Sequence, residues 1–382
     1  MKKEQKKNKR LKQFLFGAVV ALLFLPMLQH KFRFFEETPL KGAFTLSEKS
    51  PLNKETWFLG KYQEKQEQYI SEHTGFRPGW VRFYNQWNYS LLSKPGTSGV
   101  IVGKENYLYE EGYIRAYYGM DFVGEKQIGE TTHKLKALQD TLDRKGITLA
   151  VIFAPGKASY YPEYIPDRYH QKRGATNYEE YRKQFEKQAV RFIDMHQWFE
   201  SMKKTTPYPL FSKTGIHWTA YGQYFATDSL VNYVSDVCKY EIPRFVLDRM
   251  IVSDTPMVDD NDIGRAMNLF VALPDLKMAY PKFHPSREAR KTDPKVLVIA
   301  DSFYWGLFNA NVSHFLFNDG EFWYYNEQVY PDTFTKETLV KKQNLDQKLR
   351  ENKVVFILIT DANLHKFGFG FVEMAAKKYG IK

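Results

Sequence analysis

The sequence predicts an α/β protein in which a parallel sheet is covered by helices on both faces. Three strongly apolar runs are typical of buried strands, at 149–154, 295–303 and 353–360. Segments with helical periodicity lie between or beside them, at 126–145, 177–189 and 218–237. Buried strands that alternate with helices favour a parallel, doubly covered sheet. Apolar residues make up 43% of the 382 positions, which is enough for a real core and excludes global disorder.

Residues 1–35 predict a basic tail followed by a membrane anchor. Seven of the first 12 residues are basic, and the apolar stretch Phe14–Leu28 carries no charge. Its 15 residues also suit the core of a signal peptide, but no A-x-A-like cleavage site follows. We therefore expect an uncleaved signal anchor, with a cleaved signal peptide as the alternative. The basic tail places the N-terminus in the cytoplasm and the remaining chain outside it.

The rest of the chain divides into a lead-in, at 36–95, and one large domain, at 96–382. The lead-in begins irregularly and then has a helical pattern at 54–93, broken at 74–80. The large domain opens with a hairpin pattern, GVIVGKENYLYEEGYI, whose turn falls at Gly103–Asn106. A further strand is expected at 189–195. Residues 239–290 fit no simple alternation, and we interpret them as an insertion with short helices.

The charge pattern and the cysteine content exclude several function classes. The net charge is +11, but about half of it lies in the first 12 residues, and the remainder is only weakly and evenly basic. No nucleic-acid-binding motif occurs, so we expect no nucleic-acid partner. The single cysteine, Cys238, excludes an internal disulfide and a cysteine-rich metal site. No metal-binding or nucleotide-binding motif is present, and we expect no metal and no cofactor.

Three residues at or near expected strand ends suggest chemistry. Ser302 directly follows a buried strand, where a sharp turn exposes the hydroxyl and nearby amides can stabilise an oxyanion; a helix cap is the simpler alternative. His217 precedes a helix in a turn-like segment and suits a general base, although a lone histidine is more often structural. Lys157 follows the strand at 149–154, where it can neutralise a nearby carboxylate or only solvate a loop. Functional groups gather at the carboxyl edge of such sheets.

Four short motifs, in order and spacing, resemble the alginate O-acetyltransferase AlgJ/AlgX-like family, which is SGNH-hydrolase-like. They are GKENYLYE at 103–110, FAPGKASYYPE at 153–163, the His217-Trp218 pair before a helix, and ADSF at 300–303. The resemblance extends from about residue 54 to the C-terminus. It implies that Ser302 is the nucleophile, that His217 is its base, and that Trp218 fixes the histidine loop by packing. Weaker supporting or oxyanion candidates are Asp301, Phe303, Lys157 and Asn363; for Asn363 a turn cap is the simpler interpretation.

The chain departs from the family motifs at two positions. The glycine of the nucleophile motif is Ala300, a conservative change, whereas the acid of Asp-x-His-Trp falls on Gly215. No carboxylate is therefore available there to orient the imidazole. The Gly215 carbonyl, Asp194 or Asp301 are the alternatives, and Asp228 is a poor candidate at about 16 Å along a helix. We expect an active Ser–His dyad with an unassigned third member rather than a degenerate site.

The resemblance implies an extracytoplasmic O-acyltransferase, usually of acetyl groups, that acts on a polysaccharide. The family's acyl donor is thought to come through a polytopic membrane-bound O-acyltransferase, so such a protein is the expected partner. With water as the acceptor the same site would be a carbohydrate esterase. The rival class is a catalytically degenerate module that binds glycan or scaffolds the membrane transferase. The aromatic tract at 322–326 fits either a glycan-facing surface or a core strand.

Overall fold

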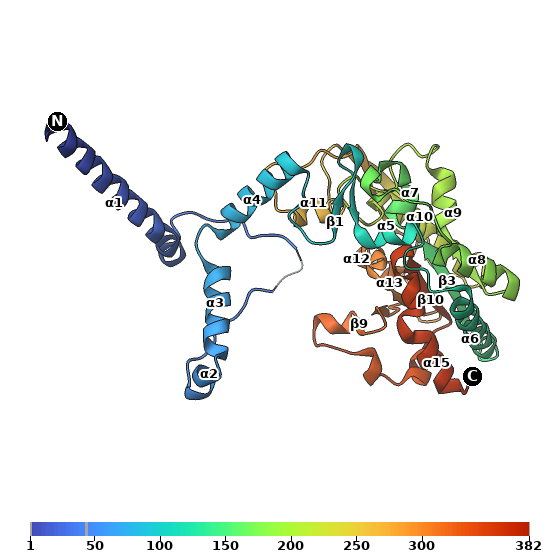
Figure 1. Cartoon of the computed structure of the whole chain (residues 1–382). Helices are drawn as coiled ribbons and strands as arrows, with labels where there is room; N and C mark the ends of the chain where they lie inside the picture. Colours follow the sequence, from blue (N-terminus) through green and yellow to red (C-terminus); the bar gives the residue numbers. More distant parts are fainter. Residues whose placement is uncertain (1, 43–44, 382) are drawn as a thin grey trace. The chain divides into compact units, whose positions relative to one another are not determined.

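The structure is a computed structural model that describes residues 2–42 and 45–381 (Figure 1). The side chains of residues 2–7, in the expected basic tail, and residues 43–44, in the expected lead-in, lie outside the described residues. The chain divides into two compact units. Unit 1 comprises Met1–Ser98 and Gly264–Ala272, and unit 2 comprises Gly99–Ile263 and Leu273–Lys382.

In the described part of Met1–Ser98, unit 1 has the helices α1 (Lys2–Phe32), α2 (Lys54–Phe58), α3 (Lys61–His73) and α4 (Arg77–Leu92). The expected helical break is confirmed and is short, because only Thr74–Phe76 separate α3 from α4. Within α1, the 25 residues Asn8–Phe32 are long and apolar enough to cross a membrane. This helix fits a single-pass membrane anchor.

Unit 2 is built on a six-stranded sheet with the strand order β4-β3-β10-β7-β8-β9. All neighbouring strands are parallel except β8 and β9, which pair antiparallel at one edge. The predicted parallel sheet is therefore confirmed, with one reversed edge strand. The strands are β3 (Thr148–Ala154), β4 (Phe192–Asp194), β7 (Val296–Ala300), β8 (Phe322–Tyr324), β9 (Gln328–Tyr330) and β10 (Val354–Thr360).

Helices cover both faces of this sheet, as expected for continuous apolar strands. On one face, alternate residues of β10 (Val355, Ile357 and Ile359) share a core with four helices. These are α6 (Glu125–Asp143), α8 (Asn177–Gln188), α14 (Leu345–Glu351) and α15 (Phe371–Tyr379). Helices α6 and α15 lie side by side in Figure 1. On the other face, Phe356 contacts Tyr233, in the π-helical turn Tyr233–Val237 that continues α10 (Ala220–Asn232).

Two antiparallel hairpins complete unit 2. The first, β1 (Val100–Val102) with β2 (Leu108–Glu110), confirms the predicted opening hairpin. The second pairs β5 (Phe245–Ser253) with β6 (Met278–Pro285). The segment interpreted as an insertion with short helices is thus mainly a long hairpin, and its one α-helix, α11 (Asp262–Ala266), lies between the two strands. Short helices elsewhere are α5 (Glu111–Tyr117), α7 (Lys157–Tyr160), α9 (Met195–Met202), α12 (Trp305–Asn309) and α13 (Val312–Phe315).

The aromatic tract at 322–326 forms β8 and the turn after it. Phe322 and Trp323 are fully buried, so the core interpretation holds for these two rings. Tyr324 and Tyr325 are only partly covered. The tract therefore contributes both to the core and to the carboxyl edge of the sheet.

Candidate active site

Strand β7 places Ser302 at the carboxyl edge of the sheet. The strand ends at Ala300, and a 3-10 turn spans Ser302–Tyr304. Asp301 caps this turn, because its Oδ1 accepts a hydrogen bond from the Phe303 backbone N–H at 3.1 Å. The strand and the cap together fix the sharp turn on which the serine stands, as the sequence predicted.

A loop between Phe211 and Thr219 presents His217. Its two ends are joined by a bridge between Phe211 and Trp218, and Thr219 caps α10 through a hydrogen bond from the Gly222 N–H. Trp218 is buried, and its Nε1 donates to the Phe303 carbonyl at 3.1 Å. The tryptophan thus ties the histidine loop to the serine turn, in keeping with the packing role expected of it.

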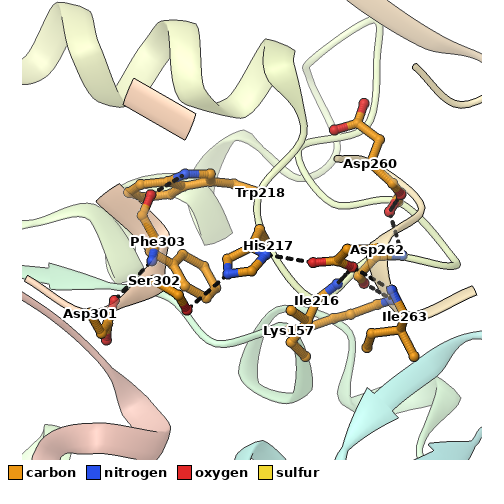
Figure 2. A network of polar contacts seen from close by, with 12 residues as sticks. Lys157, Ile216, His217, Trp218, Asp260, Asp262, Ile263, Asp301, Ser302 and Phe303 are labelled. Atoms are coloured by element: carbon orange, nitrogen blue, oxygen red, sulfur yellow. Dashed lines mark hydrogen bonds and ion pairs between the residues drawn. The ribbon is translucent and has the colours of Figure 1, made fainter. Parts of the chain in front are cut away.

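Ser302, His217 and Asp262 form one hydrogen-bonded chain (Figure 2). His217 Nε2 lies 2.9 Å from Ser302 Oγ, and His217 Nδ1 lies 2.6 Å from Asp262 Oδ2. The other carboxylate oxygen, Oδ1, accepts the Ile216 N–H at 2.9 Å, which fixes the carboxylate beside the ring. A serine, an imidazole and a carboxylate in this order form the constellation of serine acyl-transfer enzymes.

Burial and the carboxylate act in opposite directions on the pKa of His217. Burial alone lowers the pKa, but the hydrogen bond and charge of Asp262 outweigh it, so that the pKa lies above the usual histidine value. For Asp262, burial alone raises the pKa. The hydrogen bond and charge of His217 outweigh burial, so the pKa of Asp262 lies below its usual value. The geometry therefore favours an ionised Asp262 that stabilises an imidazolium.

The position of Gly215 leaves no room for an acid in the histidine loop. A Cβ at this residue would lie 2.7 Å from both the Asp260 carbonyl oxygen and Ser212 Oγ. Ser212 Oγ itself donates to that carbonyl at 2.5 Å and accepts the Gly215 N–H at 2.8 Å. The segment that carries Asp260 and Asp262 therefore packs directly on the loop, and it supplies the carboxylate from outside.

Lys157 is fully buried and holds the same loop through its ammonium group. Its Nζ donates to the backbone carbonyls of Lys213 and Gly215, each at 2.7 Å. Burial lowers its pKa to about 7, although the charges of Asp275 and Asp262 act in the opposite direction. The interpretation that it solvates a loop is wrong, and its direct partners are carbonyls rather than a carboxylate.

Asp301, the residue before the serine, and Asn363 belong to one hydrogen-bonded network. Asp301 Oδ2 accepts hydrogen bonds from the Thr360 N–H, the Thr360 hydroxyl and Asn363 Nδ2, at 2.7–2.9 Å. Asn363 Nδ2 also lies 3.2 Å from Thr360 Oγ1. Asn363 thus holds the ends of β7 and β10 together, in keeping with the capping interpretation. The Phe303 N–H is directed at Asp301 and does not point toward an oxyanion in this geometry.

Tyr325 is a site residue that the sequence did not single out. Its phenol lies close enough to the Ser302 hydroxyl and the Asn363 side chain for both to act on its pKa. Burial, with the nearby charge of Asp301, raises the pKa of Tyr325 to about 12. The phenol therefore remains protonated at neutral pH and can act as a donor beside the serine.

The four groups considered from the sequence as the third member of the catalytic site, beside Ser302 and His217, have hydrogen-bond partners elsewhere. Asp194 caps α9 by accepting the Gln197 N–H, and it also accepts the Tyr178 hydroxyl. Asp301 is occupied by Thr360 and Asn363, and the Gly215 carbonyl accepts from Lys157. Asp228 accepts from Asn232 Nδ2 on the next turn of α10. Asp262, from the segment interpreted as an insertion, is the carboxylate that contacts the imidazole, and it was not considered from the sequence.

A groove of about 600 Å³ adjoins the site at Tyr325. Aromatic rings in its lining come from Tyr181, Tyr325, Phe367 and Phe369. Charged side chains at the groove are Glu327, Lys366 and Glu373, and His365 also lines it. Phe369 packs edge-on against Tyr325, with ring centroids 5.1 Å apart, and has a left-handed backbone at φ 52°. A bulky residue in this region is strained, and such strain gathers at functional sites.

Comparison with known proteins finds one matching family model, the SGNH hydrolase-like domain of acetyltransferase AlgX, over residues 100–244. This stretch contains Lys157 and His217 and ends before Asp262 and Ser302. Two curated relatives are probable alginate O-acetylases AlgJ. The protein from Pseudomonas syringae pv. tomato is 26% identical over 139 residues, 36% of this chain and 34% of the relative. The protein from Pseudomonas putida is 27% identical over 148 residues, which are 38% of this chain and 36% of the relative.

Solved structures give weaker similarities. The O-acetyltransferase domain of Pseudomonas putida AlgJ has a TM-score of 0.47 at 18% identity and covers 73% of this chain and 99% of that one. Bacillus cereus PatB1 with a sulfonyl adduct has a TM-score of 0.45 at 11% identity, covering 71% and 97%. The matched stretch spans only about a third of each curated relative. Residues 100–244 are therefore similar to the AlgJ/AlgX-like family of SGNH-hydrolase-like proteins.

Proposed function

We propose that this chain is an extracytoplasmic O-acyltransferase that moves an acyl group, most simply acetyl, onto a hydroxyl of a polysaccharide. The observation that carries the proposal is the hydrogen-bonded chain from Asp262 through His217 to Ser302. Similarity to the AlgJ/AlgX-like family over residues 100–244 supports acetyl as the group and a glycan as the acceptor, because the curated relatives are named probable alginate O-acetylases.

The residues support a two-step transfer through an ester on Ser302. His217 Nε2 removes the proton as Ser302 Oγ attacks the carbonyl carbon of the donor ester. The tetrahedral intermediate collapses and expels the donor alkoxide, which takes the proton from the imidazolium. In the second step His217 deprotonates an acceptor hydroxyl, which attacks the acyl carbon and releases Ser302 with its proton returned. With water in place of the sugar, the same steps hydrolyse the ester.

Tyr325 is the side chain best placed to donate a hydrogen bond to the oxyanion. It lies beside Ser302 and Asn363, and its phenol stays protonated because its pKa is raised to about 12. A donor that is fixed before the charge develops stabilises the transition state without reorganisation. Tyr325 also lines the groove, so it connects the reacting atoms to the acceptor site.

The groove beside Tyr325 suits a carbohydrate acceptor. Aromatic faces pack against the C–H faces of sugar rings, and the groove offers four aromatic side chains. Polar side chains such as Gln127 and Thr131 can accept or donate hydrogen bonds to hydroxyl groups. We assign the acceptor polysaccharide to this groove, with its reacting hydroxyl directed toward Ser302.

The anchor explains how the donor reaches the site. With the basic tail in the cytoplasm, α1 holds the catalytic unit at the outer face of the cytoplasmic membrane. A polytopic membrane-bound O-acyltransferase is the expected donor, and tethering in the same membrane raises the effective concentration of the two partners.

The rival function, a degenerate glycan-binding or scaffolding module, rested on the missing acid at Gly215. Asp262 supports catalysis instead, because it supplies a carboxylate at the imidazole. One result would distinguish the non-catalytic module from the enzyme, namely a protein that binds glycan while Ser302 does not react.

Hydrolysis of a chromogenic acetyl ester by the full chain in detergent tests the proposal. Wild type is compared with Ser302→Ala, His217→Ala and, as a matched control, Ser201→Ala, which changes a serine on α9. We expect loss of activity in the first two variants only, and labelling of Ser302 by a sulfonyl fluoride. Activity that survives Ser302→Ala, or a wild type that neither hydrolyses nor labels, contradicts the catalytic proposal.

A further inference from the structure

Helix α4 of unit 1 carries its apolar face on the outside. Five large side chains on this face are each more than half exposed, namely Trp80, Phe83, Tyr84, Trp87 and Leu91. They occupy positions i, i+3, i+4, i+7 and i+11, which fall within an arc of about 100° on the helix. In a helix that packs on its own core, such a face would be buried. The five residues are called the aromatic face of α4 below.

The polar side of α4 is the side that contacts the rest of unit 1. Asn85 is buried and donates to the Met267 carbonyl at 2.8 Å. Arg82 donates to the carbonyls of Thr38 and Pro39, each at 2.9 Å. The helix is therefore already held through its polar side, and the aromatic face is directed away from these contacts.

The beginning of α4 lies beside the end of the membrane-spanning segment of α1. A Cβ on Gly75 would lie 2.7 Å from Gln29 Cβ and 2.8 Å from the backbone nitrogen of His30. Phe76, the residue before α4, packs on Phe35, and its N–H donates to Glu37 at 2.5 Å. Since the candidate span ends at Phe32, these contacts bring the start of α4 to the level at which α1 leaves the membrane.

The composition of α4 fits the membrane surface. Its 16 residues include two tryptophans, two tyrosines and two arginines, and no aspartate, glutamate or lysine. Aromatic side chains are enriched at the boundary between headgroups and hydrocarbon, and arginine is attracted to anionic headgroups. A helix with this division of side chains lies in the plane of the interface.

We propose that α4 is an interfacial helix, whose aromatic face inserts into the headgroup region of the membrane that α1 crosses. The inference rests on α1 as the anchor, which is part of the proposed function. It adds a second membrane contact, and the two contacts together restrict the orientation of unit 1 on the bilayer.

Spin labels on the full chain test the inference in liposomes of phosphatidylethanolamine and phosphatidylglycerol. Single cysteines are introduced in a Cys238→Ala background at Tyr84 and Trp87 on the aromatic face. Matched controls are Gln86→Cys on the polar side of the same helix, Val20→Cys within α1, and Glu130→Cys, an exposed position on α6. Accessibility to oxygen, which partitions into lipid, is compared with accessibility to a water-soluble nickel chelate.

We expect the labels at 84 and 87 to be several-fold more accessible to oxygen than to nickel, as at 20, and the labels at 86 and 130 to show the reverse. Labels at 84 and 87 that resemble 130, while 20 remains in lipid, overturn the interfacial helix and leave the anchor intact. A label at 20 that is accessible to nickel overturns the anchor, and the inference with it.

A second measurement uses protein without added cysteines or labels, so its result does not depend on whether the labelled variants fold. Brominated phosphatidylglycerol should quench the tryptophan fluorescence of wild type more strongly than that of the Trp80→Phe/Trp87→Phe variant. Equal fractional quenching of the two proteins overturns the inference.

Discussion

Asp262 Oδ2 lies 2.6 Å from His217 Nδ1, although 45 residues separate the two in the chain. The intervening chain includes α10 and β5, and the carboxylate returns to the histidine at the start of α11. Its second oxygen is fixed by the Ile216 N–H at 2.9 Å. The acid therefore orients both the ring and the backbone of the loop that carries it.

Asp262→Asn tests this relationship directly. We expect the turnover number for ester hydrolysis to fall by about 10²–10⁴-fold, because the amide neither orients the neutral ring correctly nor stabilises the imidazolium. His217 must be neutral to accept a proton, and Asp262 raises its pKa, so wild-type activity should decline as the pH falls through this raised pKa. In the variant this acidic decline of activity should occur at a lower pH.

The control for this variant is Asp254→Asn, which changes an exposed carboxylate on the same long segment. This variant should hydrolyse the ester at the wild-type rate, and its activity should decline at the same acidic pH as that of wild type. A pH–rate profile of Asp262→Asn that superimposes on that of wild type would show that the carboxylate is not coupled to the base.

The fold could be predicted from the sequence because its strands carry strong local signals. Runs such as 354–359 are apolar without interruption, and β10 is indeed the fully buried central strand. The segment at 239–290 lacked such a signal. In β5 only three of nine residues, Phe245, Met250 and Ile251, are both apolar and partly covered, so its pattern does not resemble a core strand.

Asp262 could not be predicted because nothing local distinguishes it. It lies in the run Asp259-Asp260-Asn261-Asp262, and the three carboxylates differ only in the tertiary contacts that they make. The loss of the acid at Gly215 is also a tertiary effect, since the Asp260 carbonyl occupies the space that a side chain would need. Motif spacing identifies the serine and the histidine, whereas the third residue depends on how a distant segment packs.

Lys157→Met should lower activity and change the pH dependence of stability. The variant loses the hydrogen bonds to the carbonyls of Lys213 and Gly215, and the shifted histidine loop should cost about 10–100-fold in turnover. In wild type the pKa of Lys157 is lowered to about 7, so the unfolded chain binds more protons above that pH. The free energy of unfolding therefore gains up to about 1.4 kcal/mol per pH unit as the pH rises above 7.

Thermal unfolding of Lys157→Met and of wild type, followed from about pH 6 to about pH 9, measures this contribution. The variant should lack the rise that the lysine gives to wild type. Lys187→Met, at an exposed position on α8, serves as the control and should follow wild type. Parallel curves for Lys157→Met and wild type would contradict a lysine buried with a lowered pKa.

His196→Phe should destabilise unit 2 in a pH-dependent way. His196 Nε2 lies 3.3 Å from Asp361 Oδ2, and its ring stacks on Tyr178 at 4.0 Å, a contact that phenylalanine preserves. Burial opposes both charges, but the pair prevails, so the pKa of His196 is raised and that of Asp361 is lowered. Loss of one partner of a buried pair costs about 3–5 kcal/mol.

The sign of each shift sets the pH window of this effect. The contribution of Asp361 is present above the ordinary aspartate pKa and is lost as the pH falls, whereas that of His196 is present at low pH and is lost as the pH rises through its raised pKa. The difference between variant and wild type should therefore be largest in mildly acidic solution. His133→Phe, at an exposed position on α6, should show no such maximum. A difference that is constant with pH would contradict the pairing.

Phe369→Ala should weaken the use of a glycan acceptor. The ring lines the groove and packs against Tyr325, so its removal takes away both an aromatic surface for a sugar and a support for the proposed oxyanion donor. An aromatic contact of this kind is worth about 0.5–1.5 kcal/mol, which corresponds to a rise in acceptor KM of up to about tenfold.

Acetyl transfer to oligosaccharides measures this effect, with hydrolysis of the small ester followed in parallel. The acceptor KM should change by a larger factor than the rate of ester hydrolysis, because only the glycan fills the groove. Glu130→Ala, an exposed position on α6 outside the groove lining, is the matched control. Equal losses of transfer and hydrolysis in Phe369→Ala would mean that the ring acts only through Tyr325, and the acceptor would have to be assigned to another surface.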